Sequence, residues 1–398
     1  MLKGIKVQIY PSKKQEQYLA SLFGTYRFVY NKSLELKIKE YTDNKKSIGL
    51  KELGKNFTDL RSKTNWIQKH NTKVLKQSIL NMLEAYKRFF VNKTGFPKFR
   101  SKHDRQSCRF PVDAISRNTF KNNKIFLTSE CKNLKFKCSD KYKKLLEQNN
   151  GKIKSATISK NKAGKYFCSF LVDINHEILI KNERVIALDL GINSFLITSE
   201  NTEITNPRFY RRNEKRLKLL QRCVSKKVKG SKNRNKARLK LAKFFYKISN
   251  QKSDFLHKLS TKLVSENYVI GVETLAVKNM MENSYLAKSI QELSLSEFVR
   301  QLEYKAVWND RLLVKVGRYF ASSKLCSECG WKNDYLTLAD RIFKCKSCEL
   351  EIGRDYNAAL NIKNEALRLI GSRPPEFKPV EISELSESVK QESNIIIK

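Results

Sequence analysis

Four cysteines in two matched pairs constrain this chain more than any other feature of its sequence. Cys326-x2-Cys329 is followed, after fifteen intervening residues, by Cys345-x2-Cys348. Each pair can turn tightly and point two thiolates at one ion, and two pairs complete a tetrahedral site with no position left for water. The spacing predicts a zinc ribbon whose Zn²⁺ is structural rather than catalytic. Four unrelated buried cysteines and a redox pair are the alternatives, and the matched spacing disfavours both.

The remaining cysteines and the apolar segments bear on the compartment. The other five cysteines are scattered, at Cys108, Cys131, Cys138, Cys168 and Cys223. An odd and unevenly spaced set argues for reduced thiols in a cytosol. Met1 to Lys14 has no long apolar core, so we expect no signal peptide. No apolar run approaches the roughly 20 residues that span a bilayer. We therefore expect a cytoplasmic protein without a membrane partner.

The charge balance is strongly one-sided. Lysine and arginine number 80 against 39 aspartates and glutamates, a formal net charge of +41 over 398 residues. Self-repulsion of this size destabilises a compact fold unless a polyanion neutralises it. Because the basic residues are spread along the whole chain, nucleic acid is a better partner than a membrane surface. A merely soluble basic surface is the alternative, although such a surface rarely reaches this charge.

The densest basic stretch runs from Arg208 to Lys247 and holds 17 basic residues and one acid, Glu214. A solvated helix face is one interpretation, but such a face usually carries acids that pair with the bases at i,i+4. We instead interpret the stretch as a phosphate-binding helical region, with candidate contacts at Arg211, Arg212 and Arg216. The sequence leaves open whether the bound strand is RNA or DNA.

Periodicity indicates an α+β arrangement in the first half of the chain. Ile5 to Tyr10 predicts a strand, and Ser12 and Gln15 have the spacing of a capping box for the helix that follows. Apolar residues recur at helical intervals from Thr72 to Phe90. From about Arg109 to Ile174 the pattern alternates, which predicts a small β-barrel or sheet.

The second half of the chain mixes strands and helices. Arg184 to Thr198 predicts two strands in a hairpin, and Tyr268 to Val272 predicts a buried strand. Leu293 to Leu313 and Arg354 to Ile370 predict amphipathic helices. After Gly371 the prolines, serines and scattered charges are typical of a flexible tail.

Three acids stand at the ends of predicted elements. One apolar strand ends in Asp189, a second ends in Glu273, and Asp355 opens the last helix. At one edge of a sheet, three such carboxylates could hold two Mg²⁺ ions about 4 Å apart and clamp a phosphodiester. Asp355 could instead be an N-cap, and Asp189 could serve the turn before Gly191. The order strand-Asp, strand-Glu, helix-Asp is that of ribonuclease-H-like nucleases.

A series of short motifs resembles TnpB, the accessory protein that bacterial insertion sequences encode and a relative of type V CRISPR effectors. The resemblance covers about Gly4 to Ile370. Its landmarks, each unremarkable alone but specific in this order, are Tyr10-Pro11, Arg27–Asn31, Ala85-Tyr86, Phe89-Phe90, Gly95–Phe99, Leu188–Gly191, Asp254–Leu259, Arg300–Lys305, Ser322-Ser323 and Arg354–Ile362.

The resemblance implies a multidomain chain of α+β and α/β parts. A β-barrel wedge domain comprises residues 1–10 and 105–182, with a helical recognition insert at 11–104. An RNase-H-like RuvC nuclease domain comprises 183–321 and 353–371. The zinc ribbon is inserted at 322–352, and the flexible tail is 372–398.

The resemblance also implies a function. Such a protein is an RNA-guided DNA endonuclease of the bacterial cytosol and nucleoid, probing double-stranded DNA with a guide RNA from the transposon end and supporting transposon retention. It cuts beside a short adjacent motif by RuvC-type hydrolysis with two Mg²⁺ ions. One protein monomer with one RNA is expected.

Particular residues take roles under this resemblance. Asp189, Glu273 and Asp355 are the Mg²⁺ ligands, and Arg354 could stabilise phosphate charge in the transition state. Lys76 and Gln77 on the recognition helix could reach base edges of the adjacent motif. Gly353 stands where many relatives carry an aspartate, but the metal-binding acid of that motif is the later one. The chain has no room for an HNH domain.

Three other functions compete with the endonuclease. A nuclease-dead, RNA-guided DNA-binding repressor should have lost one or more of the three acids, and all three are present. A transposase with a tyrosine nucleophile would need a His-x-His pair, and none exists among His70, His103, His176 and His257. A structural RNA-binding protein of the ribosomal kind would not need the acids.

The charge generates a first test. We expect the affinity of the chain for guide RNA to fall by about 10³-fold or more between about 50 and 200 mM salt, because each neutralised phosphate releases condensed counterions. Filter binding over a salt series measures the slope. A nearly flat dependence would remove the phosphate-binding interpretation of Arg208 to Lys247.

Overall fold

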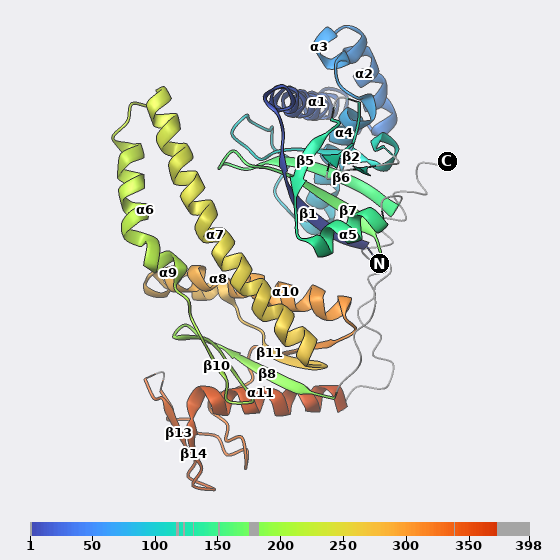
Figure 1. Cartoon of the computed structure of the whole chain (residues 1–398). Helices are drawn as coiled ribbons and strands as arrows, with labels where there is room; N and C mark the ends of the chain where they lie inside the picture. The colour runs from blue at the N-terminus through green and yellow to red at the C-terminus, as the bar shows by residue number, and fades with distance from the viewer. Residues whose placement is uncertain are drawn as a thin grey trace. The chain divides into compact units, whose positions relative to one another are not determined.

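A computed structural model describes residues 2–116, 119–121, 124–129, 131–149, 152–174, 183–337 and 339–371. These residues form two compact units (Figure 1). The first contains the described residues up to Ile174 together with Val228–Lys243, and the second contains residues 183–227 and 244–371. The segment predicted as a flexible tail, 372–398, lies outside the described residues.

The first unit begins with a strand and a long helix, as predicted. Strand β1 (Leu2–Tyr10) leads into α1 (Lys13–Asn44). The expected capping box is present: the Ser12 backbone N–H donates to Gln15 Oε1 at 2.8 Å, and the Gln15 N–H donates to Ser12 Oγ at 3.4 Å. This satisfies helix-end donors that have no intrahelical partner. One face of α1 is buried in the core, through Leu19, Leu22, Phe23, Tyr26 and Tyr30.

Three helices follow, α2 (Leu50–Ser62), α3 (Asn65–Gln68) and α4 (Thr72–Asn92). The predicted helix over Thr72 to Phe90 is therefore confirmed, and its predicted core residues Leu75, Ile79 and Met82 are fully buried. The prediction that Phe90 lies on the buried face is wrong, because its side chain is 72% exposed. Burial along α4 stops at Tyr86, and Phe90 stacks on that ring at the exposed end of the helix.

The rest of the first unit is a seven-stranded antiparallel sheet in the order β2-β6-β7-β1-β5-β4-β3. The predicted alternation is confirmed in β7, where Tyr166, Cys168, Phe170 and Val172 face the core. The predicted closure into a barrel stays a prediction. A helix that the pattern did not predict, α5, lies between β5 and β6. The bounds are β2 Gln106–Pro111, η1 Val112–Ala114, β3 Phe120–Lys121, β4 Lys124–Ile125, β5 Leu134–Lys137, α5 Asp140–Gln148, β6 Ile153–Lys160 and β7 Tyr166–Asp173.

The second unit is built on a five-stranded mixed sheet in the order β10-β9-β8-β11-β12. Strands β8 to β10 form an antiparallel meander, whereas β11 runs parallel to both β8 and β12. The predicted hairpin over Arg184 to Thr198 and the predicted strand near Tyr268 are confirmed. The bounds are β8 Val185–Leu190, β9 Ser194–Thr198, β10 Glu203–Thr205, β11 Val269–Glu273 and β12 Leu312–Val316.

The predicted helix from Leu293 to Leu313 is wrong in its last part. Helices α8 (Val277–Met280), α9 (Ser284–Leu293) and α10 (Leu295–Trp308) precede the strand β12. Asp310 has a positive φ of 52°, which ends the helix and turns the chain into β12. Leu312 and Leu313 continue the helical spacing of apolar residues by coincidence, although the run Leu-Leu-Val-Lys-Val favours a strand.

Two long helices fill the basic stretch of the sequence, α6 (Phe209–Ser225) and α7 (Lys232–Glu266). The C-terminal part of α7 packs in the core of the second unit through Leu256, Leu263 and Val264. None of the helices that the structure describes combines the length and the apolar character needed to cross a membrane.

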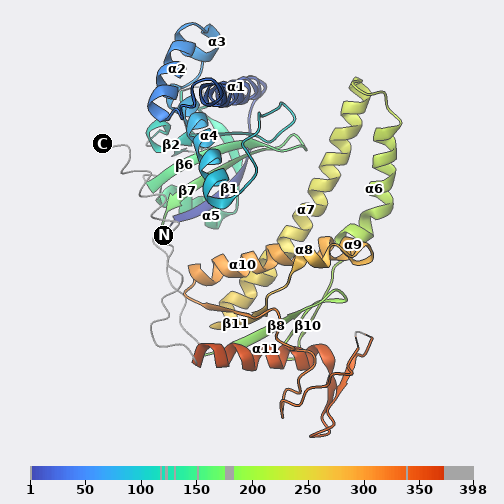
Figure 2. The same cartoon turned by 180° about the vertical axis from the view of Figure 1, so that it is seen from behind.

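Helix α11 (Arg354–Gly371) lies along the sheet of the second unit in both views (Figures 1 and 2). The contact is close because small residues, Gly271, Ala187 and Ala366, meet there beside Ile362. A Cβ placed on Gly271 of β11 would lie 3.1 Å from the Cβ of Ala366 and 3.3 Å from the Cβ of Ala187. The small hairpin of β13 (Ile342–Lys344) and β14 (Glu351–Gly353) immediately precedes α11.

We expect Gly271→Ala to destabilise the protein by about 1–3 kcal/mol, because the added methyl group overpacks a contact that has no flexible neighbour. Thermal or urea unfolding measures the change. Gly54→Ala is the matched control: Gly54 lies inside α2 with open space around its Cα, so alanine there should stabilise the protein by roughly 0.5–1 kcal/mol. Equal effects of the two substitutions would contradict the close approach of α11.

Candidate functional site

Three acidic side chains meet at one end of the sheet of the second unit. Asp189 lies near the end of β8 and Glu273 is the last residue of β11. These strands are parallel neighbours with Leu188 opposite Val272, so the next residue of each strand lies at the same end. Asp355 is the second residue of α11, the helix that packs on β8. Because α11 begins at Arg354, Asp355 lies inside its first turn, and the N-cap alternative does not hold.

The electrostatics of these acids reflect their proximity. Burial, and then the charges of Glu273 and Asp355, raise the pKa of Asp189 to about 7, while the nearby charge of Arg354 opposes the shift. Burial also raises the pKa of Glu273, against a hydrogen bond from Ser322 that lowers it. Buried carboxylates that repel one another favour either a proton or a cation. The end of the sheet is therefore a place where a cation would be stabilised.

The carboxylates are looser than the cysteine cluster. Among the residues that the structure describes, only the four cysteines form a group of at least three metal-ligating side chains whose ligand atoms all lie within 4.8 Å of one another. The structure thus brings Asp189, Glu273 and Asp355 into electrostatic contact, and their role as metal ligands stays a prediction.

Ser322 is a functional candidate that the sequence analysis did not assign. Its hydroxyl donates a hydrogen bond to Oε1 of Glu273, and its backbone carbonyl accepts one from Nδ2 of Asn361 at 2.8 Å. Both Ser322 and Asn361 are buried. Ser322 therefore orients the Glu273 carboxylate and is itself held by α11. One feature of the sequence could have indicated this contact. Asn357 and Asn361 are spaced i and i+4 on the last helix, and the residues that follow them are alanine and isoleucine.

Those asparagines fasten the ribbon segment to α11. Asn357, which is completely buried, donates from Nδ2 to the Leu325 carbonyl at 2.6 Å and accepts from the Ser327 N–H at 3.0 Å. Asn361 donates to the same Leu325 carbonyl at 2.7 Å. Buried amides are costly unless their hydrogen bonds are satisfied, so this pairing fixes the position of the chain just before Cys326.

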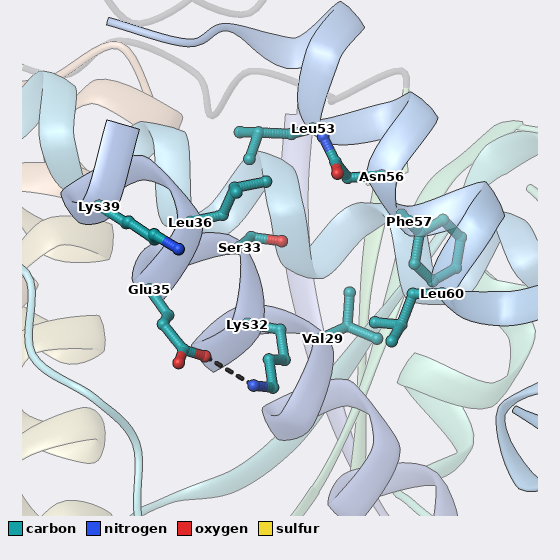
Figure 3. A pocket seen from close by; sticks show the side chains of 10 residues that line it. All are labelled: Val29, Lys32, Ser33, Glu35, Leu36, Lys39, Leu53, Asn56, Phe57 and Leu60. Atoms are coloured by element: carbon teal, nitrogen blue, oxygen red, sulfur yellow. Dashed lines mark ion pairs between the residues drawn. The ribbon is translucent and has the colours of Figure 1, made fainter. Parts of the chain in front are cut away.

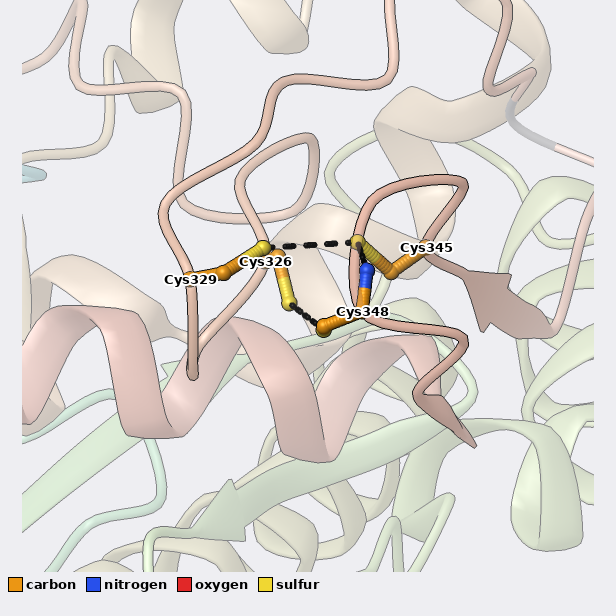
Figure 4. Close-up of side chains that lie close together, drawn as sticks. All are labelled: Cys326, Cys329, Cys345 and Cys348. Atoms are coloured by element: carbon orange, nitrogen blue, oxygen red, sulfur yellow. Dashed lines mark hydrogen bonds between the residues drawn. The ribbon is translucent and has the colours of Figure 1, made fainter.

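The four predicted cysteines form one cluster (Figure 4). The Sγ atoms of Cys326 and Cys348 lie 3.6 Å apart, and those of Cys329 and Cys345 lie 3.5 Å apart. Four thiolates around Zn²⁺ at about 2.3 Å would be separated by about 3.8 Å. The donor set and the spacing fit a closed tetrahedral metal site.

The two cysteine turns have the same backbone construction. In the first, the Cys326 N–H donates to the Trp331 carbonyl at 2.8 Å, and Gly330 has a φ of +76°. In the second, the Cys345 N–H donates to the Leu350 carbonyl at 2.9 Å, and the fourth residue on, Glu349, has a φ of +61°. Hydrogen bonding from the Trp331 N–H lowers the pKa of the Cys329 thiol to about 7, which favours the thiolate that a metal needs.

Arg354 connects the ribbon to the acids. Its Nη1 donates to the carbonyls of Thr337 at 3.0 Å and Asp340 at 3.4 Å, while its charge lowers the pKa of Asp189. Its Nε is buried and has no hydrogen-bond partner among the described residues. The guanidinium is thus held beside the acids, as the predicted role in charge stabilisation requires, and that role stays a prediction.

The predicted nucleic-acid contacts lie in different surroundings. Lys76 is exposed on α4, but Gln77 is 9% exposed and its Nε2 donates to Asn81 Oδ1 at 3.5 Å. Arg211 is engaged with Ser289 Oγ at 2.8 Å and lies 3.8 Å from a carboxylate oxygen of Glu292. Arg212 and Arg216 are exposed on α6. The period of α4 did not reveal that Gln77 faces inward.

The lysine and arginine side chains of the basic stretch are almost all exposed. Of its 17 basic residues, 16 are exposed and only Arg234 is half-buried. The single acid, Glu214, pairs with Lys218 at 3.0 Å and Lys288 at 2.7 Å. Positive charge on α6 and the start of α7 is therefore largely uncompensated, which favours binding of a polyanion.

A hollow of about 270 Å³ lies between α1 and α2 in the first unit (Figure 3). Its lining includes the apolar side chains of Val29, Phe57 and Leu60, and an ion pair of 2.8 Å joins Lys32 to Glu35 at its edge. It contains none of the predicted site residues, and its lining offers no arrangement for acid, base or metal chemistry.

Three family models match the chain. Residues 169–284 match OrfB_IS605, described as "Probable transposase", and residues 296–362 match the Cas12f1-like TNB domain. Residues 1–46 match a helix-turn-helix domain of the same OrfB_IS605 group, although the structure there consists of β1 and the single helix α1.

Related proteins extend over most of the chain. A Streptomyces pristinaespiralis protein named "Putative RNA-guided DNA endonuclease" is 32% identical over 90% of this chain and 88% of its own length. An Escherichia coli K12 protein, "Putative RNA-guided DNA endonuclease InsQ", is 26% identical over 91% of each chain. The "TnpB-like protein L79" of Acanthamoeba polyphaga mimivirus is 24% identical over 91% of this chain and 73% of its own.

Among solved structures, a Cas12f1 chain from a complex with sgRNA and target DNA shares the fold with a TM-score of 0.58, at 15% identity, over 92% of this chain and 99% of that one. The fold, the ordered motifs and the full-length relatives agree, and the chain belongs to the TnpB family.

Proposed function

We propose that this chain is an RNA-guided endonuclease that cuts double-stranded DNA by hydrolysing phosphodiester bonds at the acids of the second unit. The observation that carries the proposal is the meeting of Asp189, Glu273 and Asp355 at one end of the sheet, in a chain whose relatives are named as RNA-guided DNA endonucleases. A nuclease-dead repressor is not favoured, since all three acids are in place.

The order of the second sheet supports a RuvC-type, RNase-H-like nuclease domain. An antiparallel meander of three strands is extended by two parallel strands, and a helix carrying the third acid lies on the sheet. We assign residues 183–321 and 353–371 to this domain and 322–352 to the zinc ribbon. In the first unit we assign the antiparallel sheet to a wedge domain and α1 to α4 to the recognition insert.

Carboxylate oxygens are the ligands that Mg²⁺ prefers. Burial, and then the charges of Glu273 and Asp355, raise the pKa of Asp189 to about 7, and a divalent cation would stabilise its ionised form. Asp189, Glu273 and Asp355 would hold the metal. When bound, Mg²⁺ would supply Lewis acidity and an activated water for phosphodiester hydrolysis. Four thiols in a closed cluster would hold Zn²⁺ in a purely structural role.

Other residues of the chain would orient the metal ligands, stabilise charge and bind the nucleic acid. Ser322 keeps one carboxylate oxygen of Glu273 in place, so this ligand does not reorganise when a phosphate arrives. Arg354, anchored to two ribbon carbonyls, holds positive charge beside the acids. The exposed basic residues of α6 and α7, including Arg212 and Arg216, would bind backbone phosphates without reading sequence. Base pairing with a guide RNA would supply the sequence specificity.

Zinc removal tests the ribbon. We expect Cys326→Ser to abolish stoichiometric zinc binding and to lower the melting temperature, because the ribbon has almost no apolar core besides the metal cluster. Metal analysis and thermal unfolding of the full chain check this. Cys223→Ser, at an exposed cysteine of α6, is the matched control and should change neither quantity. A zinc-free Cys326→Ser protein that melts like the wild type would overturn the structural role.

Isosteric substitution tests the acids. Asp189→Asn, Glu273→Gln and Asp355→Asn should each lower Mg²⁺-dependent cleavage of a matched DNA target by at least about 100-fold, because each removes a charged oxygen ligand. Binding of the guide and target should persist, since base pairs and basic residues carry it. A cleavage assay beside a gel shift, with guide RNA recovered from the wild-type protein, separates the two effects.

The control for the acids is Asp254→Asn, which neutralises an exposed acid of α7 whose partner is the surface residue Lys258. Its cleavage rate should stay within about twofold of wild type, because exposed ion pairs contribute little. Full cleavage by one of the three acid variants would show that the wrong acid is assigned. Full cleavage by all three would refute the nuclease site.

A further inference from the structure

A second hollow in the first unit is lined by arginines that none of the roles above uses. It has a volume of about 490 Å³ and lies where the middle of α4 meets the start of β2 and the buried face of α1. Four arginines line it, Arg88, Arg100, Arg105 and Arg109, against a single acid, Glu84. Four positive charges and one negative charge leave a net charge of +3 around one concave site.

The strand periodicity of β2 builds one wall of this arginine pocket. Arg105, Ser107 and Arg109 line the pocket at alternate positions. Cys108 also belongs to the lining although it is only 1% exposed, and Phe110 beyond them is buried in the core. Arg109 is paired across the sheet with Thr157 of β6, which also lines the pocket. Successive side chains of a strand point to opposite faces, so the core packing of Phe110 in β2 fixes Arg109 toward the hollow, and Arg105 directly precedes the strand.

A helix and a loop build the opposite wall. Asn81, Glu84 and Arg88 recur on one face of α4, and Asn81 donates to the Tyr26 hydroxyl of α1 at 2.8 Å. Arg88 is held by Glu84, with 3.2 Å between Nε and Oε1. The loop residue Arg100 is fixed separately.

Arg100 is positioned before any ligand binds. Its guanidinium lies 3.7 Å from the centre of the Tyr30 ring. Asn31 also clamps its backbone, donating to the Arg100 carbonyl at 2.9 Å and accepting from its N–H at 2.8 Å. A preorganised guanidinium loses little conformational entropy when it binds an anion.

The side chains of the other two arginines, Arg105 and Arg109, are available to bind a ligand. Within the described parts of the chain, the side chains of Arg105 and Arg109 make no ion pair and no hydrogen bond. Their two guanidinium groups can therefore turn their N–H donors toward a ligand without breaking a hydrogen bond or an ion pair, while Arg100 stays in place against Tyr30.

We propose that the arginine pocket binds a backbone phosphate of a nucleic-acid strand. Guanidinium groups match the geometry of phosphate oxygens and form charge-assisted bidentate hydrogen bonds with them. The hollow, of about 490 Å³, has room for a phosphate group. The proposal rests on the proposed function in one respect, the identity of the polyanion as nucleic acid, and it adds a fixed phosphate site outside the exposed surface of α6 and α7.

The test substitutes Arg105 and Arg109 together. Arg105→Gln/Arg109→Gln is compared with Lys51→Gln/Lys55→Gln, which removes the same charge from the exposed face of α2. Two labelled probes are titrated with full-length protein at fixed salt: the RNA recovered with the wild type, and a random 40-base-pair DNA duplex. We expect the arginine variant to lose tenfold or more in affinity for one of the probes, and the lysine variant to lose less than twofold.

Ethylation interference locates the contact. With the wild type, ethylating one phosphate of the affected probe should weaken binding, and this single-phosphate effect should vanish in the arginine variant. The probe that shows it identifies the strand as RNA or DNA. Equal losses in both variants, or an interference pattern unchanged in the arginine variant, would overturn the proposal. So would binding of inorganic phosphate with no effect on either probe.

Cleavage separates this inference from the proposed function. A wild type that cuts its target while the arginine variant binds both probes normally would refute the pocket and leave the endonuclease intact. If the wild type never cuts DNA but its single-phosphate contact depends on Arg105 and Arg109, the phosphate-binding pocket would be supported and the endonuclease function refuted.

Discussion

The contact between α11 and the sheet of the second unit fixes where the three acids lie relative to one another. At Gly271 one more methyl group would lie 3.1 Å from the Cβ of Ala366 and 3.3 Å from that of Ala187, closer than side chains usually pack. Because interiors are close-packed, such a contact has one geometry rather than a range of them. That geometry sets Asp355 beside the ends of β8 and β11, and so converts three acids far apart in sequence into one site.

Helix α11 also holds the ribbon segment in place. Asn357 and Asn361 bind the segment before Cys326, and Asn361 also binds the carbonyl of Ser322, whose hydroxyl reaches Glu273. The four-cysteine cluster is therefore joined to the acids through a short chain of buried hydrogen bonds. The position of the cysteine cluster and the orientation of Glu273, a proposed metal ligand, therefore depend on the same hydrogen bonds from α11.

The sequence predicted features whose cause is local. The capping box at Ser12, the cysteine spacing and the acids after apolar strands all depend on a few neighbouring residues, and the structure has the cap, the cluster and the strand ends where they were expected. Features set by tertiary contacts were missed. Leu312 lies in a strand because β11 offers it an edge, and Phe90 is exposed because the core ends at Tyr86. The spacing of apolar residues along the sequence does not reveal which of them meet a neighbouring strand or where the core ends.

The distribution of charge makes the two proposed binding events depend on each other. Basic residues are exposed on α6 and α7 and line the arginine pocket, whereas at the sheet end burial, and then the charges of Glu273 and Asp355, raise the pKa of Asp189 to about 7. A phosphodiester drawn in by the basic surfaces would meet carboxylates of its own sign. A divalent cation held by these carboxylates would lessen that repulsion, and bound nucleic acid would add further negative charge beside the cation. Nucleic acid and metal should therefore each strengthen the binding of the other at this site.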